Sequence, residues 1–571
     1  MKVLFAALHL AHFRNFESVI RELVARGHEV HLTGDEPEGL GGEELARRLA
    51  SDYPGRVTWG RLPSLDDEPW YDAARRMRVA LDYVRVLDPR YPPKLRLRAQ
   101  RRAARVVRWA TTLPSGTRVM LPALKRVERL MPTSDAIVRY LREHAPDVVI
   151  LASLTLSRSQ QLDLLKAARV LNLPVSAAIM SWDHLSSKAL LHMVPDQVIV
   201  WNDVQKREAV AMHGLPEERI VVTGAQCYDQ WFTRTPERSR EELCRAVGLR
   251  PDRPFVLWVC SAFTPRIDPP EPALITRWLD ALRSSSNPVL RDVGVLVRPH
   301  PERVKEWVGV SLDHYENVAF HGRNPIDSDA KTDYFDSLYH SSAVVGLCTS
   351  AFLEAAIVGR PVLAFLLPEY RMHQVEMVHF QYLLNVEGGL LHTASDIGTN
   401  LHQLAEAMAL EGRRDERNRR FLGAFVRPRG LDTPATPAFV EAIEQLHRTG
   451  PRPDPSLESG TWLRPIVASA ASWSRIGVGR WLMNDMRADE NDEHEDDAAR
   501  SLRARRAARA ARVSAKVRRK ARRQRRDALL LKAKEAKSAL RSMRFRTAMF
   551  AHRVLALAGI GRGDFPDDSK E

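Results

Sequence analysis

The chain has few cysteines and no long apolar run, and both absences limit what it can be. Four cysteines are scattered over 571 residues without C-x-x-C spacing, which argues against a zinc site and a disulfide framework. No apolar stretch reaches the length of about 18 residues that a membrane-spanning helix needs. The first residues also lack the charged segment and cleavage site of an ordinary secretion signal. We therefore expect a protein of the reducing cytoplasm.

The net charge of +15 is concentrated in two segments. Residues 500–546 contain 20 lysines and arginines against two acids, and residues 75–129 contain 16 against three. The rest of the chain is net acidic, and residues 488–497 alone carry seven acids. Basic clusters of this kind bind a polyanion or form a solvated face.

Short apolar runs alternate with amphipathic stretches along the first 240 residues. Residues 2–8 form a predicted strand, residues 15–26 a helix and residues 29–33 a second strand, which together make one βαβ unit. Further strands are predicted at residues 147–151, 174–179, 197–201 and 219–224. Strands that alternate with helices predict a parallel sheet.

A second series of the same kind begins with a strand at 255–260 and ends with a helix near 435–448. The predicted fold class is therefore α/β, with two Rossmann-like domains facing across a cleft and a basic helical C-terminal tail. The predicted boundaries are 1–240 for the first domain with a basic helical insertion at about 75–129, 250–448 for the second domain, 449–499 for a linker with the acidic run, and 500–571 for the tail.

Two polar side chains follow a predicted strand at 293–298. Arg298 and His300 come directly after this apolar run, where Pro299 and Pro301 end it. Ligands of open α/β sheets bind beyond the carboxyl ends of the strands, and a guanidinium beside an imidazole suits a phosphate group. A surface histidine in a proline-rich turn is the alternative.

A second polar group follows the predicted strand at 343–348. Thr349 and Ser350 supply hydroxyls at the start of a helix, whose positive end attracts anions. Glu354 lies one turn into that helix, where it would accept ribose hydroxyls or complement the helix dipole. The two hydroxyls would equally suit an ordinary helix cap.

The first half carries two polar clusters of its own. His9, His12, Arg14 and Asn15 lie in the loop that leaves the first strand. A histidine with a pKa near neutrality could take the proton of an acceptor hydroxyl. The other cluster, Ser181–Lys188, follows a predicted strand, and an N-cap with a packed tryptophan is its alternative interpretation. From it we select Asp183 and His184 as catalytic candidates and Ser186 and Lys188 as acceptor contacts.

These segments resemble the GT-B glycosyltransferase superfamily, especially the bacterial enzymes of capsule and teichoic-acid synthesis that are similar to CDP-glycerol glycerophosphotransferases or polysialyltransferases. Arg298-Pro-His300-Pro301 resembles their His-Pro motif, and Thr349-Ser350 resembles their paired hydroxyl motif. Residues 317–323 match the strand and loop that contact the nucleotide base, and Ser261 occupies the place of a phosphate-contacting loop. The resemblance thus implies donor binding by Ser261, Arg298, His300, Gly322, Arg323, Thr349, Ser350 and Glu354.

The resemblance also implies what the enzyme would do. A glycosyl or polyol-phosphate group would pass from a nucleotide-activated donor to a cell-surface polysaccharide or lipid-linked acceptor. The loop with His9, His12, Arg14 and Asn15 faces the cleft in such enzymes and carries acceptor contacts or a base. GT-B enzymes typically need no bound metal and no cofactor beyond the donor, so we expect neither a metal site nor a cofactor.

The basic segments indicate a partner and leave two alternatives open. Clustered lysines and arginines attract an anionic bilayer, which predicts peripheral attachment to the inner face of the plasma membrane. A sugar-nucleotide isomerase similar to UDP-GlcNAc 2-epimerases would share the fold, although it has no need of a membrane-directed tail. A nucleic-acid-binding protein would use the arginine-rich tail directly, but the tail has few aromatic residues between its charges, so nucleic acid is the less expected partner.

Overall fold

The computed structural model describes residues 1–37, 41–157, 159–262, 269–323, 325, 328–409, 416–453 and 461–473. The predicted acidic run and the basic tail lie outside the described residues. All described residues belong to the first of the two units into which the chain divides, residues 1–496.

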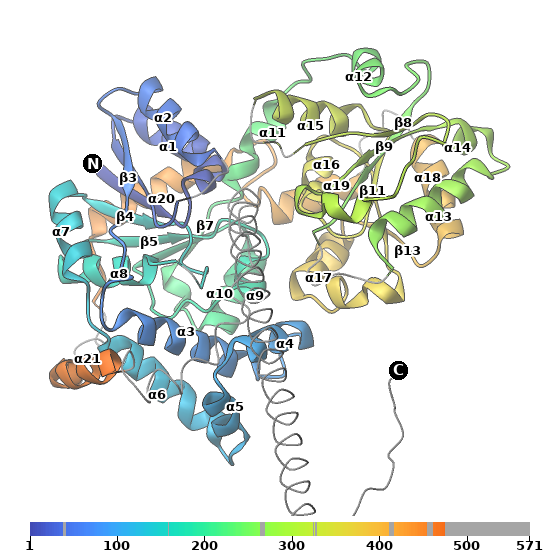
Figure 1. Ribbon diagram of the computed structural model, residues 1–571. Coiled ribbons are helices and arrows are strands. Elements are labelled where there is room, and N and C mark those ends of the chain that lie inside the picture. Colours follow the sequence, from blue (N-terminus) through green and yellow to red (C-terminus); the bar gives the residue numbers. More distant parts are fainter. Residues whose placement is uncertain are drawn as a thin grey trace, which may run out of the picture. The chain divides into compact units, whose positions relative to one another are not determined.

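Two separate parallel sheets organise the described chain (Figure 1), which confirms the predicted α/β fold of two Rossmann-like units. The first sheet has seven strands, in the order β3 (Val57–Arg61), β2 (Glu29–Gly34), β1 (Lys2–Ala7), β4 (Val148–Leu151), β5 (Val175–Ala178), β6 (Gln197–Val200) and β7 (Ile220–Val222). The second has six, in the order β10 (Val318–Phe320), β9 (Gly294–Arg298), β8 (Phe255–Val259), β11 (Ala343–Gly346), β12 (Val362–Phe365) and β13 (His392–Ala394).

Both faces of each sheet are buried, because the strands are apolar on both sides. Along β1, Val3 and Phe5 point into one core while Leu4 and Ala6 point into the other. This alternation follows from the period of two residues in a strand, and helices on both faces are the usual cover of a parallel sheet. The pairing is in register, with Val3 opposite Val30 of β2 on one side.

The helices that follow the strands complete these layers. The first half contains α1 (Glu17–Ala25), α2 (Gly42–Asp52), α3 (Tyr71–Val86), α4 (Pro93–Arg102), α5 (Arg105–Thr112), α6 (Gly116–Leu130), α7 (Asp135–His144), α8 (Gln161–Val170), α9 (His184–Ser187), α10 (Asp203–His213) and α11 (Asp229–Thr233). The second contains α12 (Arg240–Val247), α13 (Glu271–Arg283), α14 (Pro288–Asp292), α15 (Ser328–His340), α16 (Ala351–Ile357), α17 (Val378–Asn385), α18 (Ile397–Ala409) and α19 (Glu416–Phe425).

The last long helix, α20 (Ala435–Thr449), packs differently from the expectation. The sequence placed it at the end of the second series, but its side chains Phe439 and Ile443 lie in the same core as Phe5 and Phe16 of the first half. The chain therefore returns to the first sheet after α19. The final described helix, α21 (Arg464–Trp473), also contributes Ala471 to the first half.

The basic segment predicted at about 75–129 contains the helices α3 to α6, between β3 and α7. These four helices differ in how much of each is buried. Most of α3 is buried against the first sheet, whereas α5 has no buried residue. The α4 residue Leu95 lies in an apolar cluster with Met377 and Phe380 of the second half.

Candidate functional site

A pocket of about 470 Å³ lies at the carboxyl end of β10. The loop after this strand, the helix α15 and the segment around α12 form its walls. The lining residues are Arg238, Ala246, Phe320, His321, Gly322, Arg323, Asp329 and Asp333. Its position matches the general location of ligands in open α/β sheets.

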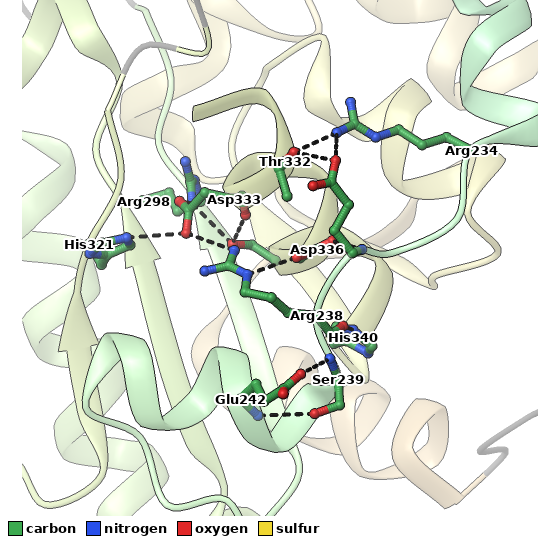
Figure 2. Close-up of polar contacts among 12 residues, drawn as sticks. Arg234, Arg238, Ser239, Glu242, Arg298, His321, Thr332, Asp333, Asp336 and His340 are labelled. Atoms are coloured by element: carbon green, nitrogen blue, oxygen red, sulfur yellow. Dashed lines mark hydrogen bonds and ion pairs between the residues drawn. The ribbon is translucent and has the colours of Figure 1, made fainter. Parts of the chain in front are cut away.

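Asp333 of α15 is the centre of the polar network in this pocket (Figure 2). Its carboxylate accepts hydrogen bonds from Arg298 Nη1 at 2.6 Å, from Arg238 Nη2 at 3.1 Å and from His321 Nε2 at 3.3 Å. Burial alone would raise the pKa of Asp333, but the hydrogen bonds from His321 and Arg298 outweigh it and hold the pKa well below its usual range. The carboxylate is therefore ionised and fixes three side chains around the pocket.

Arg298 is placed at the end of β9, as the sequence predicted, but it is buried. Its Nη1 also donates to Ser337 Oγ at 3.0 Å, so this nitrogen has two partners within the protein. The predicted phosphate clamp stays a prediction. In this structure the Arg298 guanidinium binds Asp333, and Arg298 is not one of the residues that line the pocket.

Gly322 packs directly onto that guanidinium. Its φ of +130° lies in a region that side chains rarely adopt, and a Cβ atom built there would lie 2.7 Å from Arg298 Cζ. Glycine is therefore required for the close approach. Arg323, the next residue, is exposed at the pocket wall.

The predicted hydroxyl motif follows β11. Ser261 is buried and its Oγ accepts a hydrogen bond from the Cys348 backbone N–H at 3.0 Å, which joins the ends of β8 and β11. Thr349 Oγ1 accepts from the Ala351 N–H at 3.3 Å, while Ser350 is exposed and makes no cap bond. The helix α16 that follows has only seven residues, so its dipole is small.

Glu354 of α16 accepts a hydrogen bond from the Tyr334 hydroxyl. Burial raises the pKa of Glu354 to about 7, although the charge of Arg14 acts to lower it. A residue from the loop after β1 thus lies near a residue of the second half. His300 follows β9 and is half-buried, and its carbonyl accepts from the Arg303 N–H at 2.8 Å.

The other candidates from the loop after β1 lie on η1 (Leu10–Asn15) or next to it. The rings of His9 and His12 are 5.3 Å apart, and His12 Nδ1 lies 3.4 Å from Ser153 Oγ. The Asn15 carbonyl accepts from Gln226 Nε2 at 3.5 Å. The catalytic and acceptor roles of these residues stay predictions.

The second predicted cluster surrounds α9. Asp183 accepts hydrogen bonds from Ser181 Oγ at 2.6 Å and from Ser187 Oγ at 2.9 Å. Burial would raise the pKa of Asp183, but the charges of His184 and Lys188 outweigh it and hold the pKa well below its usual range. So acidic a carboxylate is a weak base at neutral pH and a strong partner for cations.

The remaining residues of this cluster have close contacts of their own. Ser186 is buried and its Oγ donates to the Asp183 carbonyl at 3.3 Å. His184 Nδ1 lies 3.5 Å from Thr155 Oγ1. The part of the chain that the structure describes contains no cluster of side chains suited to a metal ion and no helix able to cross a bilayer.

Sequence reasoning included Phe320 in the segment 317–323 but missed Arg238 and Asp333 in the pocket. A signal for the last existed, because Asp329, Asp333 and Asp336 recur at intervals of three and four residues and so share one face of α15. No signal links Arg238 to them across 95 residues. Such a pairing depends on how the elements pack.

Comparison with known proteins gives a likeness in structure only. No family model and no curated protein matches this sequence. A glycosyltransferase from Rickettsia africae has a TM-score of 0.46 at 12% identity, with 78% of this chain and 98% of that chain covered. UDP-GlcNAc 2-epimerase from Methanocaldococcus jannaschii has a TM-score of 0.44 at 13% identity, with coverages of 78% and 100%. The Rickettsia bellii UDP-N-acetylglucosamine 2-epimerase has a TM-score of 0.45 at 12% identity, with 79% of this chain and 97% of that chain covered. Likeness of this degree does not indicate a substrate or a reaction.

Proposed function

We propose that this chain is a GT-B transferase that moves a glycosyl or polyol-phosphate group from a nucleotide-activated donor to a cell-surface polysaccharide or lipid-linked acceptor. One observation carries the proposal, namely the pocket at the carboxyl end of β10, where an aromatic ring, cationic groups and a carboxylate surround an open volume. A nucleoside diphosphate uses all three kinds of contact, through its base, its phosphates and its ribose.

The pocket suits a nucleoside diphosphate. Phe320 is 45% exposed and its ring is supported by Trp307 at 4.5 Å between centroids, so it offers a fixed surface for a base. Arg323 would donate to phosphate oxygens. The exposed carboxylate of Asp329 would accept hydrogen bonds from ribose hydroxyls.

The reacting groups are proposed on the neighbouring elements. Glu354 of the second half lies near Arg14 of the first half. Arg14 belongs to the same loop as His9 and His12, so this loop lies near the second half. One of these histidines would take the proton of the acceptor hydroxyl. Asp183 would hold a cationic or hydroxyl group of the acceptor in place.

Gly322→Ala tests the donor pocket. The added methyl group overlaps the Arg298 guanidinium, so the loop or the guanidinium must move. We expect the affinity for the preferred nucleoside diphosphate, found by thermal shift with UDP, CDP and GDP, to fall about tenfold or more, equal to about 1.4 kcal/mol. Titration calorimetry with the purified chain measures it.

Gly309→Ala is the matched control. Gly309 also has a positive φ, +84°, but nothing lies within 4 Å of its added Cβ, so backbone strain is present without the overlap. Affinity that falls equally in both variants, or in neither, would argue against this pocket as the donor site.

Product analysis distinguishes the reaction class. A transferase releases the nucleoside diphosphate or monophosphate only when an acceptor takes the transferred group. Formation of a second nucleotide sugar without any acceptor would instead identify an isomerase similar to UDP-GlcNAc 2-epimerases. Hydrolysis alone would support neither.

The acceptor side of the proposal includes an anionic membrane surface. On α5 and its neighbours, apolar side chains are exposed beside arginines such as Arg101 and Arg105. The exposed apolar residues are Leu97, Val106, Trp109, Leu113 and Val119. Apolar insertion beside basic charge is the pattern of a peripheral membrane contact.

Trp109→Ser tests this surface. Trp109 is 63% exposed, so its replacement should leave the fold intact. We expect binding to vesicles that contain phosphatidylserine to weaken about fivefold or more in a sedimentation assay, because the largest inserting group is lost. Trp462→Ser, which changes an exposed tryptophan outside α3 to α6, is the control and should bind as the unchanged chain does. Preferential binding to nucleic acid would contradict the membrane proposal.

A further inference from the structure

Arg238 brings a segment between the two halves of the chain into the wall of the pocket. This residue lies between α11 and α12, in residues 234–239, and it lines the pocket together with Phe320. Its side chain is 30% exposed. A ligand in the pocket therefore lies against this segment as well as against β10 and α15.

The guanidinium of Arg238 is held by two carboxylates of one helix (Figure 2). Its Nε donates to Asp336 at 2.9 Å, and its Nη2 donates to Asp333 at 3.1 Å. Both acids lie on α15, three positions apart, and so share one face of that helix. Asp336 is fully buried, which fixes its carboxylate. The plane of the guanidinium is thereby set before a ligand binds.

The backbone of Arg238 is fixed to the same helix. The Glu237 N–H donates to Asp336 at 3.2 Å, and His340 Nε2 donates to the Arg238 carbonyl at 2.7 Å. The next residue, Ser239, is the N-cap of α12. Arg238 therefore has little conformational freedom left to lose, and a group held in this way binds a ligand at a low cost in entropy.

The remaining nitrogen of this guanidinium, Nη1, carries two N–H groups and donates to none of the described residues. Protein atoms do not enclose Nη1 either, since it is not one of the buried side-chain atoms without a partner. Because Nε and Nη2 bind α15, Nη1 is the nitrogen that is available to a ligand in the pocket.

The charges around Arg238 decide which kind of oxygen suits Nη1. Arg238 and Arg298 carry two positive charges, and the carboxylates to which they donate, Asp333 and Asp336, carry two negative charges. A phosphate at Nη1 would be repelled by both carboxylates, whereas an uncharged carbonyl oxygen would not. This group of four side chains therefore favours an uncharged acceptor.

We propose that Arg238 Nη1 donates to a carbonyl oxygen of the nucleotide base, and that it thereby selects uracil, cytosine or guanine against adenine. The inference rests on the proposed function in one respect, that the ligand of the pocket is a nucleoside diphosphate. A base stacked on Phe320 presents its edge to the pocket walls, and Arg238 belongs to one of them. A carbonyl oxygen accepts from Nη1, while the amino group of adenine is itself a donor.

Arg238→Lys tests this contact. The lysine ammonium keeps a positive charge beside Asp333 and Asp336 but lacks the further nitrogen that would donate to the base. We expect the affinity for the preferred nucleotide among UDP, CDP and GDP to fall about fivefold or more, the effect of one lost hydrogen bond. The affinity for inorganic pyrophosphate should stay the same. Titration calorimetry measures both, and the melting temperature without ligand shows that the variant is folded.

ADP measures the selection itself. In the unchanged chain, ADP should bind about tenfold more weakly than the preferred nucleotide, because adenine has no carbonyl oxygen to offer. In Arg238→Lys this difference should shrink to about twofold, since only the preferred nucleotide loses a bond. An arginine with a purely structural role would instead weaken the binding of both nucleotides equally when it is replaced.

Arg234→Met is the matched control. Arg234 belongs to the same segment and also binds α15, through Thr332 Oγ1 at 3.0 Å, but it does not line the pocket. This variant should bind all four nucleotides and pyrophosphate as the unchanged chain does.

Three results would overturn the proposal: a folded Arg238→Lys variant with unchanged affinity for the preferred nucleotide, an equal loss of affinity for pyrophosphate, or equal binding of ADP and the preferred nucleotide by the unchanged chain. Failure of the proposed function alone looks different. The nucleotides would then bind with the expected selectivity, but product analysis would find no group transferred from any of their sugar derivatives. A chain that binds none of the four nucleotides would refute both.

Discussion

Arg78→Ala is expected to lower the free energy of unfolding by about 3–5 kcal/mol, the cost of leaving buried charges without their partner. Arg78 of α3 donates to both carboxylate oxygens of Asp163 at 2.8 and 2.7 Å, and to Glu128 at 3.0 Å. Lys166 also binds Glu128 at 2.7 Å, and the four side chains are at most 6% exposed. The network joins α3 and α6 to α8 on the first sheet.

Denaturant unfolding measures this loss. Arg78→Lys keeps the charge but not the two-pronged contact with Asp163, so an intermediate loss is expected. Arg101→Ala, an exposed change in the same basic segment, is the control and should alter the free energy of unfolding by less than about 0.5 kcal/mol. Equal stability of Arg78→Ala and the control would contradict the structural role of the network.

The network also predicts a pH dependence. Burial would raise the pKa of Glu128, but the charges of Arg78 and Lys166 outweigh it and lower the pKa below its usual value. A carboxyl group with a lowered pKa in the folded state stabilises the fold above its unfolded pKa, and this contribution is lost as the pH falls below that value. Arg78→Ala should therefore lose less stability on acidification than the unchanged chain does.

The strands of the two sheets could largely be predicted from the sequence, and the reason is physical. A parallel strand covered on both faces is a continuous apolar run, as in residues 294–298 and 343–346. The two missed strands, β3 and β13, lie at sheet edges, where burial is incomplete and the apolar run is short or mixed. Edge strands carry a weaker signal for this reason.

The candidate site was only partly accessible from the sequence. Arg298 and Thr349-Ser350 do lie at the ends of their strands, as predicted, because a parallel sheet fixes where its loops emerge. Of the predicted donor residues, however, only Gly322 and Arg323 line the pocket, and the donor roles of the others stay predictions. The sequence did not indicate that Asp333 would bind the Arg298 guanidinium, or that Arg238 would reach Asp333 across 95 residues. These contacts depend on tertiary packing, which local patterns do not encode.

Another contact that depends on tertiary packing lies at the start of α20. It involves both segments in which the chain crosses from one half to the other. Asp229 of α11 accepts hydrogen bonds from Arg427 Nη2 at 2.8 Å, from the Ala435 N–H at 3.0 Å, and from the N–H and hydroxyl of Thr436, each at 2.7 Å. Pro434 at the N-cap supplies no side-chain bond, so the Asp229 carboxylate caps this helix from a distance of 206 residues along the chain. The Asp229 carboxylate thus joins the first crossing segment, at α11, to the second crossing segment, which precedes α20.

Asp229→Ala should therefore lower the free energy of unfolding by about 3–5 kcal/mol, because it leaves the buried Arg427 charge and two N–H groups of α20 without their partner. Asp229→Asn retains one acceptor oxygen and should lose less. Asp432→Ala removes an exposed carboxylate from the loop that precedes α20 and is the matched control. Denaturant unfolding gives the free energies, and limited proteolysis should cut Asp229→Ala fastest around residues 427–435. Resistance equal to that of the control would mean that apolar packing of Phe439 and Ile443 alone holds α20 on the first sheet.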